Sequence, residues 1–284
     1  MNTFKTALLL TGLTLLLIFG GAAIAGERGM QFALIIAVVM NGAAYFFSDK
    51  IALAMSGAKP VTREQAPRLY AIAERLCGQA GLPLPKLYVI PQPAPNAFAT
   101  GRNPSNASVA VTAGLMELMN EEEVEGVIAH ELGHVRNYDI LIASVAATLA
   151  GAITMLASMG RFALLFGGYG RGDDRGGGNA LGAILMLFLA PIAAVLVQLA
   201  ISRQREYAAD AAAARMVGHP FGLVKALEKL GTYNKRIPMD VAPATASLFI
   251  VAPLGAGGTF MSLFSTHPPL EKRIAALRNL VVTR

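Results

Sequence analysis

The sequence predicts a mainly α membrane protein, with four transmembrane helices and a composite α+β domain that contains a small β-sheet. The first observation is a shortage of charge: only 15% of the 284 residues are charged, whereas a soluble domain normally has about 25%. The second is the concentration of that shortage in four apolar windows without Asp, Glu, Lys or Arg, each long enough for a membrane-spanning helix of about 17 to 25 residues. These windows are residues 6–25, 30–47, 140–159 and 180–201.

The first two windows predict an N-terminal transmembrane hairpin, residues 1–47. Lys5, the apolar run after it and the small residues 23–25 also match a secretory signal with its cleavage site. However, the run is longer than the apolar core of a usual signal, and the second window follows after only residues 26–29. This spacing favours an uncleaved helical hairpin.

The other two windows predict a second transmembrane hairpin, residues 140–201. Its connector, residues 167–178, is rich in glycine and lacks the Lys and the spacing of a phosphate-binding loop. We therefore expect a flexible, exposed turn there.

Residues 48–139 and 202–284 hold most of the polar side chains, and we interpret them as one composite domain. Short runs with strand composition, separated by Pro, Asn and Gly, predict a small sheet. These runs are residues 87–90, 97–100 and 108–112.

Four helix starts are predicted in this domain. The capping-box spacing of Thr62 and Gln65 opens a helix that ends at Gly81. Asn120, followed by three glutamates, opens another. Because residues 121–159 contain no proline, we expect this helix to continue through the third apolar window as one rod. The remaining helices begin near Pro220 and near Pro268.

The net charge of +6 does not indicate a nucleic-acid partner, because the chain has no Trp and no basic run interleaved with aromatic residues. The basic residues instead gather near the window ends, where they favour a lipid bilayer as partner and a cytoplasmic location of the polar domain. On the cytoplasmic side we place Lys5, Lys50, Lys59, Arg136, Arg203 and Arg205, against Arg28, Arg161, Arg171 and Arg175 on the other side.

His130, Glu131 and His134 form the most specific chemical motif of the chain. The two histidines are one turn apart on one helix face, at the spacing that lets both bind one Zn²⁺. Glu131 lies about 100° round the helix, so it is better placed to take a proton from water than to bind the metal. Zinc polarises a carbonyl and lowers the pKa of water, so the motif indicates peptide hydrolysis.

A catalytic zinc site normally has three protein ligands, and the two histidines supply only two of them. A metzincin-type third histidine is excluded, because position 140 is Ile and position 137 is Asn. The remaining candidates for the third ligand are Glu206, Asp210, His219 and His267.

Glu206 and Asp210 are the favoured candidates. They again lie at i and i+4 on a helix, so one carboxylate can bind the metal while the other accepts the free ring N–H of a ligating histidine. His219 directly precedes Pro220, which is better explained as a helix start.

With these residues the chain resembles the family of zinc metallopeptidases that includes the CAAX prenyl endopeptidases and bacterial heat-shock membrane proteases. The resemblance covers nearly the whole chain, including Ser-Thr-His-Pro at residues 265–268. It implies a gluzincin-like zinc peptidase domain with one zinc ion per chain. The implied ligands are His130, His134 and Glu206, with Glu131 as general base and Asp210 behind a ligating histidine.

The resemblance also implies how substrate is bound. The segment Asn96, Ala97, Phe98 and Ala99 looks like the family's edge strand, whose backbone pairs with an extended polypeptide. His267 and Arg273 resemble residues that face the cleft, His267 in a catalytic role and Arg273 near the substrate.

The implied function is an endopeptidase of the bacterial inner membrane, with its active site facing the cytoplasm, that cuts misfolded or damaged membrane proteins in stress-related quality control. Its partners would be membrane-protein or unfolded polypeptide substrates and the bilayer; no pattern indicates an oligomeric state. Prenyl endopeptidases have more membrane helices than the four windows found, so a farnesylated substrate is not implied.

Two other classes of protein are weaker alternatives. A membrane scaffold with a purely structural zinc would need four protein ligands, whereas the sequence offers three good ones. A channel or transporter would usually carry ionisable groups within its membrane helices, and the four windows contain none.

Overall fold

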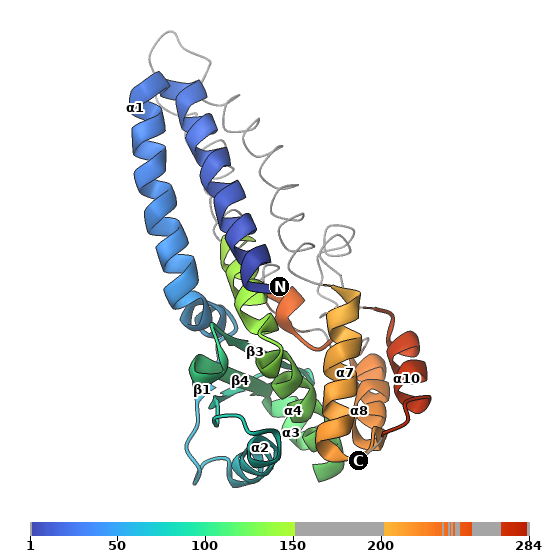
Figure 1. Cartoon of the computed structure of the whole chain (residues 1–284). Coiled ribbons are helices and arrows are strands. Elements are labelled where there is room, and N and C mark those ends of the chain that lie inside the picture. Colours follow the sequence, from blue (N-terminus) through green and yellow to red (C-terminus); the bar gives the residue numbers. More distant parts are fainter. Residues whose placement is uncertain are drawn as a thin grey trace.

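The computed structural model describes residues 2–150, 202–234, 236–237, 239, 241, 245–251 and 268–282. Most of the predicted second hairpin, residues 151–201, lies outside the described residues, and so does His267. The described part is mostly helical with one small sheet. In Figure 1, the long apolar segment α1 extends away from the sheet and the remaining helices.

Segment α1 (Asn2–Met55) folds back on itself. Gly26 has φ 61°, a conformation that suits glycine, and the two halves then lie side by side in Figure 1. Asn41 joins them by donating a 2.7 Å hydrogen bond from Nδ2 to Oγ1 of Thr14. Among the described residues, only Gly26–Met55 is long and apolar enough to cross a membrane, while Thr6–Phe19 is a shorter apolar helix. The four predicted membrane spans are therefore not confirmed.

The sheet has four strands in the order β1-β2-β4-β3. Strands β2 and β4 are parallel, and β1 and β3 pair antiparallel with their neighbours. The three predicted strands are confirmed, and β3 forms one edge of the sheet. The bounds are β1 (Lys59–Pro60), β2 (Lys86–Ile90), β3 (Ala97–Gly101) and β4 (Ala107–Thr112).

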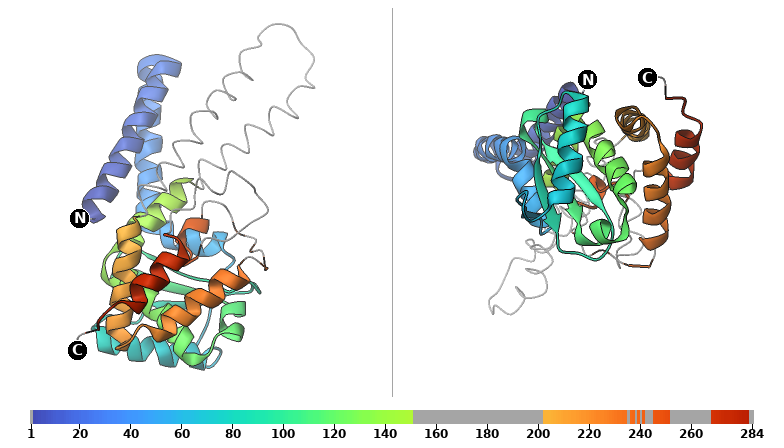
Figure 2. Two further views of the ribbon diagram at one scale, coloured as in Figure 1. Left: turned by 90° about the vertical axis from the view of Figure 1, so that its right-hand side faces the viewer. Right: turned by 90° about the horizontal axis from the view of Figure 1, so that it is seen from below.

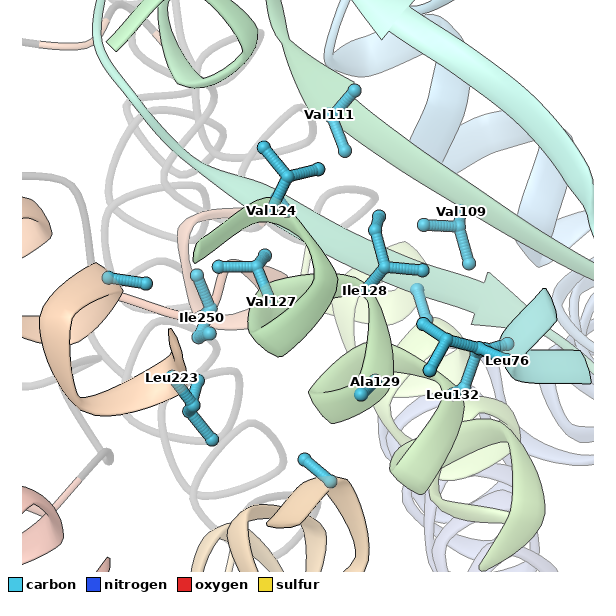
Figure 3. Packing of buried hydrophobic residues seen from close by; sticks show 14 of the residues in the cluster. Leu76, Val109, Val111, Val124, Val127, Ile128, Ala129, Leu132, Leu223 and Ile250 are labelled. Atoms are coloured by element: carbon cyan, nitrogen blue, oxygen red, sulfur yellow. The ribbon is translucent and has the colours of Figure 1, made fainter. Parts of the chain in front are cut away.

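Helix α4 (Glu121–Arg136) lies between the sheet and the C-terminal helices. It begins as predicted, because Asn120 accepts from the backbone of Glu123 and the Glu123 side chain accepts from the backbone of Asn120. Figure 3 shows Ile128 pointing toward Val109 of the sheet, while Val127 points toward Ile250 on the other side. Both faces of the helix are therefore buried.

The C-terminal helices approach α4 closely at glycines. A Cβ on Gly126 would stand 2.4 Å from the backbone nitrogen of Leu223, and a Cβ on Gly133 would stand 3.1 Å from the carbonyl oxygen of Ala209. Figure 2 shows these helices gathered on one side of the sheet. They are α7 (Arg203–Val217), α8 (Phe221–Tyr233) and α10 (Leu270–Arg278).

Two helix predictions are corrected. Helix α2 (Pro67–Ala80) ends at Gly81 as expected but begins at Pro67, because the residue before a proline is disfavoured in the helical conformation. The continuous rod is wrong: α4 ends at Arg136, and Tyr138 has φ 58°, which interrupts the helix before the next one begins at Asp139. The short helix α3 (Ala113–Leu118) connects β4 to α4.

Candidate metal centre

Three side chains from two helices converge on one point. His130 and His134 come from α4, and Glu206 comes from the first turn of α7. One ligand atom of each lies within 4.8 Å of the others. The Nε2 atoms of the two histidines are 3.2 Å apart. Oε2 of Glu206 lies 3.8 Å from Nε2 of His130, and Oε1 of Glu206 lies 3.5 Å from Nε2 of His134. These donors could hold a metal ion.

Each histidine has a carboxylate behind it. Nδ1 of His130 lies 2.9 Å from Oδ1 of Asp210, and Nδ1 of His134 lies 3.1 Å from Oδ2 of Asp139. A carboxylate that accepts the Nδ1 proton leaves Nε2 free to bind a cation and fixes the direction of the ring. Sequence reasoning found Asp210 but missed Asp139. A residue five positions after His134 faces away from it in an unbroken helix, and only the break at Tyr138 brings Asp139 back.

The site's electrostatics favour a cation between the histidines. Burial lowers the pKa of His130 to about 4, despite the hydrogen bond to Asp210. Burial also opposes the charged form of His134, but the hydrogen bond to Asp139 and the negative charge of Glu206 outweigh it and raise its pKa to about 9. The carboxylates that attract a proton here attract a metal ion in the same way, so proton and metal compete for the site.

Arg273 is fully buried next to these donors, with none of its surface exposed. It donates from Nε and Nη2 to Asp210 at 2.9 and 2.7 Å, and from Nη1 to the carbonyl of Ile250 at 3.0 Å. Burial would raise the pKa of Asp210, but the guanidinium lowers it to about 2. Arg273 thus positions Asp210, and Asp210 in turn positions the ring of His130. Direct contact between Arg273 and substrate stays a prediction.

Glu131 is buried beside the donors. Burial raises the pKa of its carboxyl to about 7, although His134, Arg273 and a hydrogen bond from the backbone of Ala99 act in the opposite direction. Its Oε1 atom makes no hydrogen bond with the described residues. The carboxyl thus has an oxygen able to accept a proton beside the metal donors, as a general base requires.

A pocket of about 40 Å³ lies against the donors and Glu131. At about 10 to 15 Å³ for each water, it has room for about three water molecules, but not for an extended peptide. Its wall also includes Ala99 of β3, Arg205 of α7, and Ser247 and Leu248. An extended peptide therefore cannot lie wholly within this pocket.

Part of that wall lies along β3. Ile250 donates a backbone hydrogen bond of 2.9 Å to the carbonyl of Ala97, and the Asn96 side chain donates to the carbonyl of Val251 at 2.8 Å. The predicted substrate-binding residues are buried: Asn96, Ala97 and Phe98 have no exposed surface, and Ala99 has 6%. Pairing of substrate with this strand stays a prediction, and it would displace these bonds.

The remaining histidine candidate in the described chain lies elsewhere. His219 stacks on Phe221 at 5.6 Å between ring centroids and does not belong to the group of metal donors. The catalytic role of His267 stays a prediction.

Two histidines one helical turn apart, a carboxylate from the next helix and a buried carboxyl beside them are typical of a metal-dependent hydrolase. The comparisons with known proteins agree. The family model of Peptidase family M48 matches residues 63–281. The chain belongs to this family and is a metallopeptidase.

The relatives are similar over nearly the whole chain. A "Protease HtpX homolog" of Desulforapulum autotrophicum is 55% identical over 278 residues, which are 98% of this chain and 90% of the relative. One from Syntrophobacter fumaroxidans is 51% identical over 282 residues, 98% of this chain and 99% of the relative. The crystal structure of S. mikatae Ste24p has the same fold, with a TM-score of 0.52 and 21% identity, over 97% of this chain but 64% of that one.

Proposed function

We propose that this chain is a zinc-dependent endopeptidase of the gluzincin type, anchored in the bacterial inner membrane, that cuts misfolded or damaged membrane proteins on the cytoplasmic side. The observation that carries the chemistry is the convergence of His130, His134 and Glu206, whose ligand atoms lie within 4.8 Å of one another. Membership of a metallopeptidase family supports the same assignment.

The donor set fits zinc. Two imidazole nitrogens and one carboxylate oxygen are the ligands of many catalytic zinc sites, and three protein ligands leave a coordination position for water. A structural site would be closed by a fourth ligand, and among the described residues the donor group has three members. When bound, zinc supplies Lewis acidity that polarises a peptide carbonyl and makes water more acidic.

The chain's own residues supply the proton transfers and the positioning. Glu131 accepts a proton from water at Oε1 and can return it to the leaving amine. Asp210 and Asp139 hold the two imidazoles in the tautomer that presents Nε2 to the metal. Arg273 neutralises Asp210, so that the buried carboxylate stays charged.

The membrane anchor is supported by the surface of α1. Its second half exposes large apolar side chains, with Phe32, Ile35 and Val39 each more than 60% exposed. Such a surface is unfavourable in water and suits a hydrocarbon environment. The cytoplasmic orientation and the quality-control substrates rest on the basic residues near the predicted window ends and on the family resemblance.

The test measures metal content beside proteolysis. The full-length protein in detergent, loaded with zinc, is compared with Glu131→Gln and Glu206→Ala, with β-casein as an unfolded substrate. We expect the parent to bind one zinc and cleave casein, Glu131→Gln to keep zinc but lose cleavage, and Glu206→Ala to lose both. Equal cleavage by the parent and Glu131→Gln would remove the catalytic assignment and leave a metal-binding scaffold.

A further inference from the structure

Arg205 is the second guanidinium at the metal centre, and the proton-transfer chemistry above does not use it. It comes from the first turn of α7, next to Glu206, and it lines the pocket. Only 13% of its side chain is exposed. Its two terminal nitrogens, Nη1 and Nη2, are buried and make no hydrogen bond with the part of the chain that the structure describes.

The neighbouring Arg273 shows what a structural arginine looks like in the same site. Its guanidinium donates two hydrogen bonds to Asp210, at 2.9 and 2.7 Å, and a third to a backbone carbonyl. Arg205, in contrast, reaches its nearest carboxylate, Oδ1 of Asp139, only at 3.9 Å, which is an ion pair but too long for a hydrogen bond.

Buried N–H donors without acceptors are rare in folded proteins, because each loses its hydrogen bonds to water without replacement. The donors of Arg205 lie at the wall of the pocket that also contains Glu131 and the metal donors. Water or an oxygen of a molecule that enters this pocket can therefore supply their acceptor.

We propose that Arg205 is a substrate-binding residue that donates hydrogen bonds to a carbonyl or carboxylate oxygen of the polypeptide, close to the bond that is cut. This inference rests on the proposed peptidase function. A guanidinium presents its donors as a planar fork, which suits both kinds of oxygen. The ion pair with Asp139 keeps the fork near the pocket and offsets part of its charge.

The main experiment compares zinc-loaded full-length Arg205→Ala and Arg205→Lys with the parent. Arg203→Ala is the matched control, because Arg203 is in the same first helical turn but is exposed. Zinc content and the melting temperature are measured first. Cleavage is then followed with quenched fluorescent peptides built on the major β-casein cleavage site, each made with either Glu or Gln at the positions flanking the scissile bond.

We expect Arg205→Ala to keep its zinc and to lose about 10- to 100-fold in kcat/KM, the scale expected for a lost hydrogen bond to a charged group. Arg205→Lys should lose less, and Arg203→Ala should stay within about twofold of the parent. An equal loss on Glu and Gln peptides identifies a backbone carbonyl as the acceptor. A loss confined to the Glu peptides identifies a side-chain carboxylate.

A binding measurement separates this inference from the peptidase function. In the Glu131→Gln background, adding Arg205→Ala should weaken binding of the same labelled peptide, measured by fluorescence anisotropy, by a similar factor. Parental kcat/KM in both Arg205 variants would overturn the inference while leaving the peptidase assignment intact. Loss of zinc in both would also overturn it, because Arg205 would then support the metal site through Asp139. Absence of cleavage in the parent would instead remove the proposed function.

Discussion

Asp139 begins a new helix, yet its carboxylate lies 3.1 Å from Nδ1 of His134, a residue of the helix before it. The contact depends on the break between the two helices, where Tyr138 adopts φ 58°, a left-handed conformation that is uncommon for a bulky residue. Strain of this kind persists where the surrounding structure imposes it, often at functional sites. The break thus gives His134 the same kind of carboxylate support that Asp210 gives His130.

The first prediction concerns this contact. Asp139→Asn should lower the affinity for zinc by about 10- to 100-fold, the usual effect of removing a carboxylate that orients a ligating histidine. Competition with a chelator of known affinity measures the change. Glu228→Gln, which removes an exposed carboxylate from α8, is the control and should bind zinc like the parent. Unchanged affinity in Asp139→Asn would mean that the contact does not support the metal site.

The second prediction concerns the buried pair of Asp210 and Arg273. Asp210→Asn removes the closer of two counter-charges of the buried guanidinium of Arg273 and leaves it paired with Glu206 at 3.4 Å, so the free energy of unfolding should fall by up to about 3 to 5 kcal/mol. The surface pair of Glu228 and Arg278 is the comparison, and its loss should cost at most about 1 kcal/mol. Urea denaturation in detergent measures both. Equal stability of Asp210→Asn and Glu228→Gln would contradict the prediction.

The third prediction concerns the glycine contacts of α4. Gly126→Ala should destabilise the protein, because the new Cβ would stand 2.4 Å from the backbone nitrogen of Leu223 and force α8 away. Gly78→Ala is the matched control, since Gly78 also lies in a helix but has no atom within 4 Å of a Cβ. That substitution should stabilise the protein by about 1 kcal/mol through helix propensity alone. If Gly126→Ala and Gly78→Ala shifted the melting temperature in the same direction, the close packing of α8 against Gly126 would not restrict the residue at this position.

Local features of the sequence predicted much of this structure. The three strands and the start of α4 follow from signals within a few residues, such as the capping pair Asn120 and Glu123. The helical spacing of His130 and His134 and the acidic pair at 206 and 210 predicted donors that the structure brings together.

The parts that sequence reasoning missed depend on contacts between distant segments. Residues 245–251 contact β3 through Asn96 and Ala97, and nothing in the composition of either segment indicates this pairing. The break at Tyr138 was missed because neither Pro nor Gly marks it. The unsatisfied donors of Arg205 become visible only once its surroundings are known.

The last prediction concerns the pH dependence of stability in the protein stripped of metal by a chelator. Burial raises the pKa of Glu131 from 4.5 to about 7, so the folded state binds this proton more tightly than the unfolded state. Its stabilising contribution is therefore fully present below about pH 4.5 and is lost as the pH rises through about 7. Glu131→Gln cannot ionise, so its stability should be within about 1 kcal/mol of the parent at pH 5 and exceed it at pH 8 by up to about 3 kcal/mol. Melting curves at the two pH values measure this difference, with the exposed Glu117→Gln as control. A difference between parent and Glu131→Gln that stays constant from pH 5 to 8 would show that burial does not raise the pKa of this carboxyl.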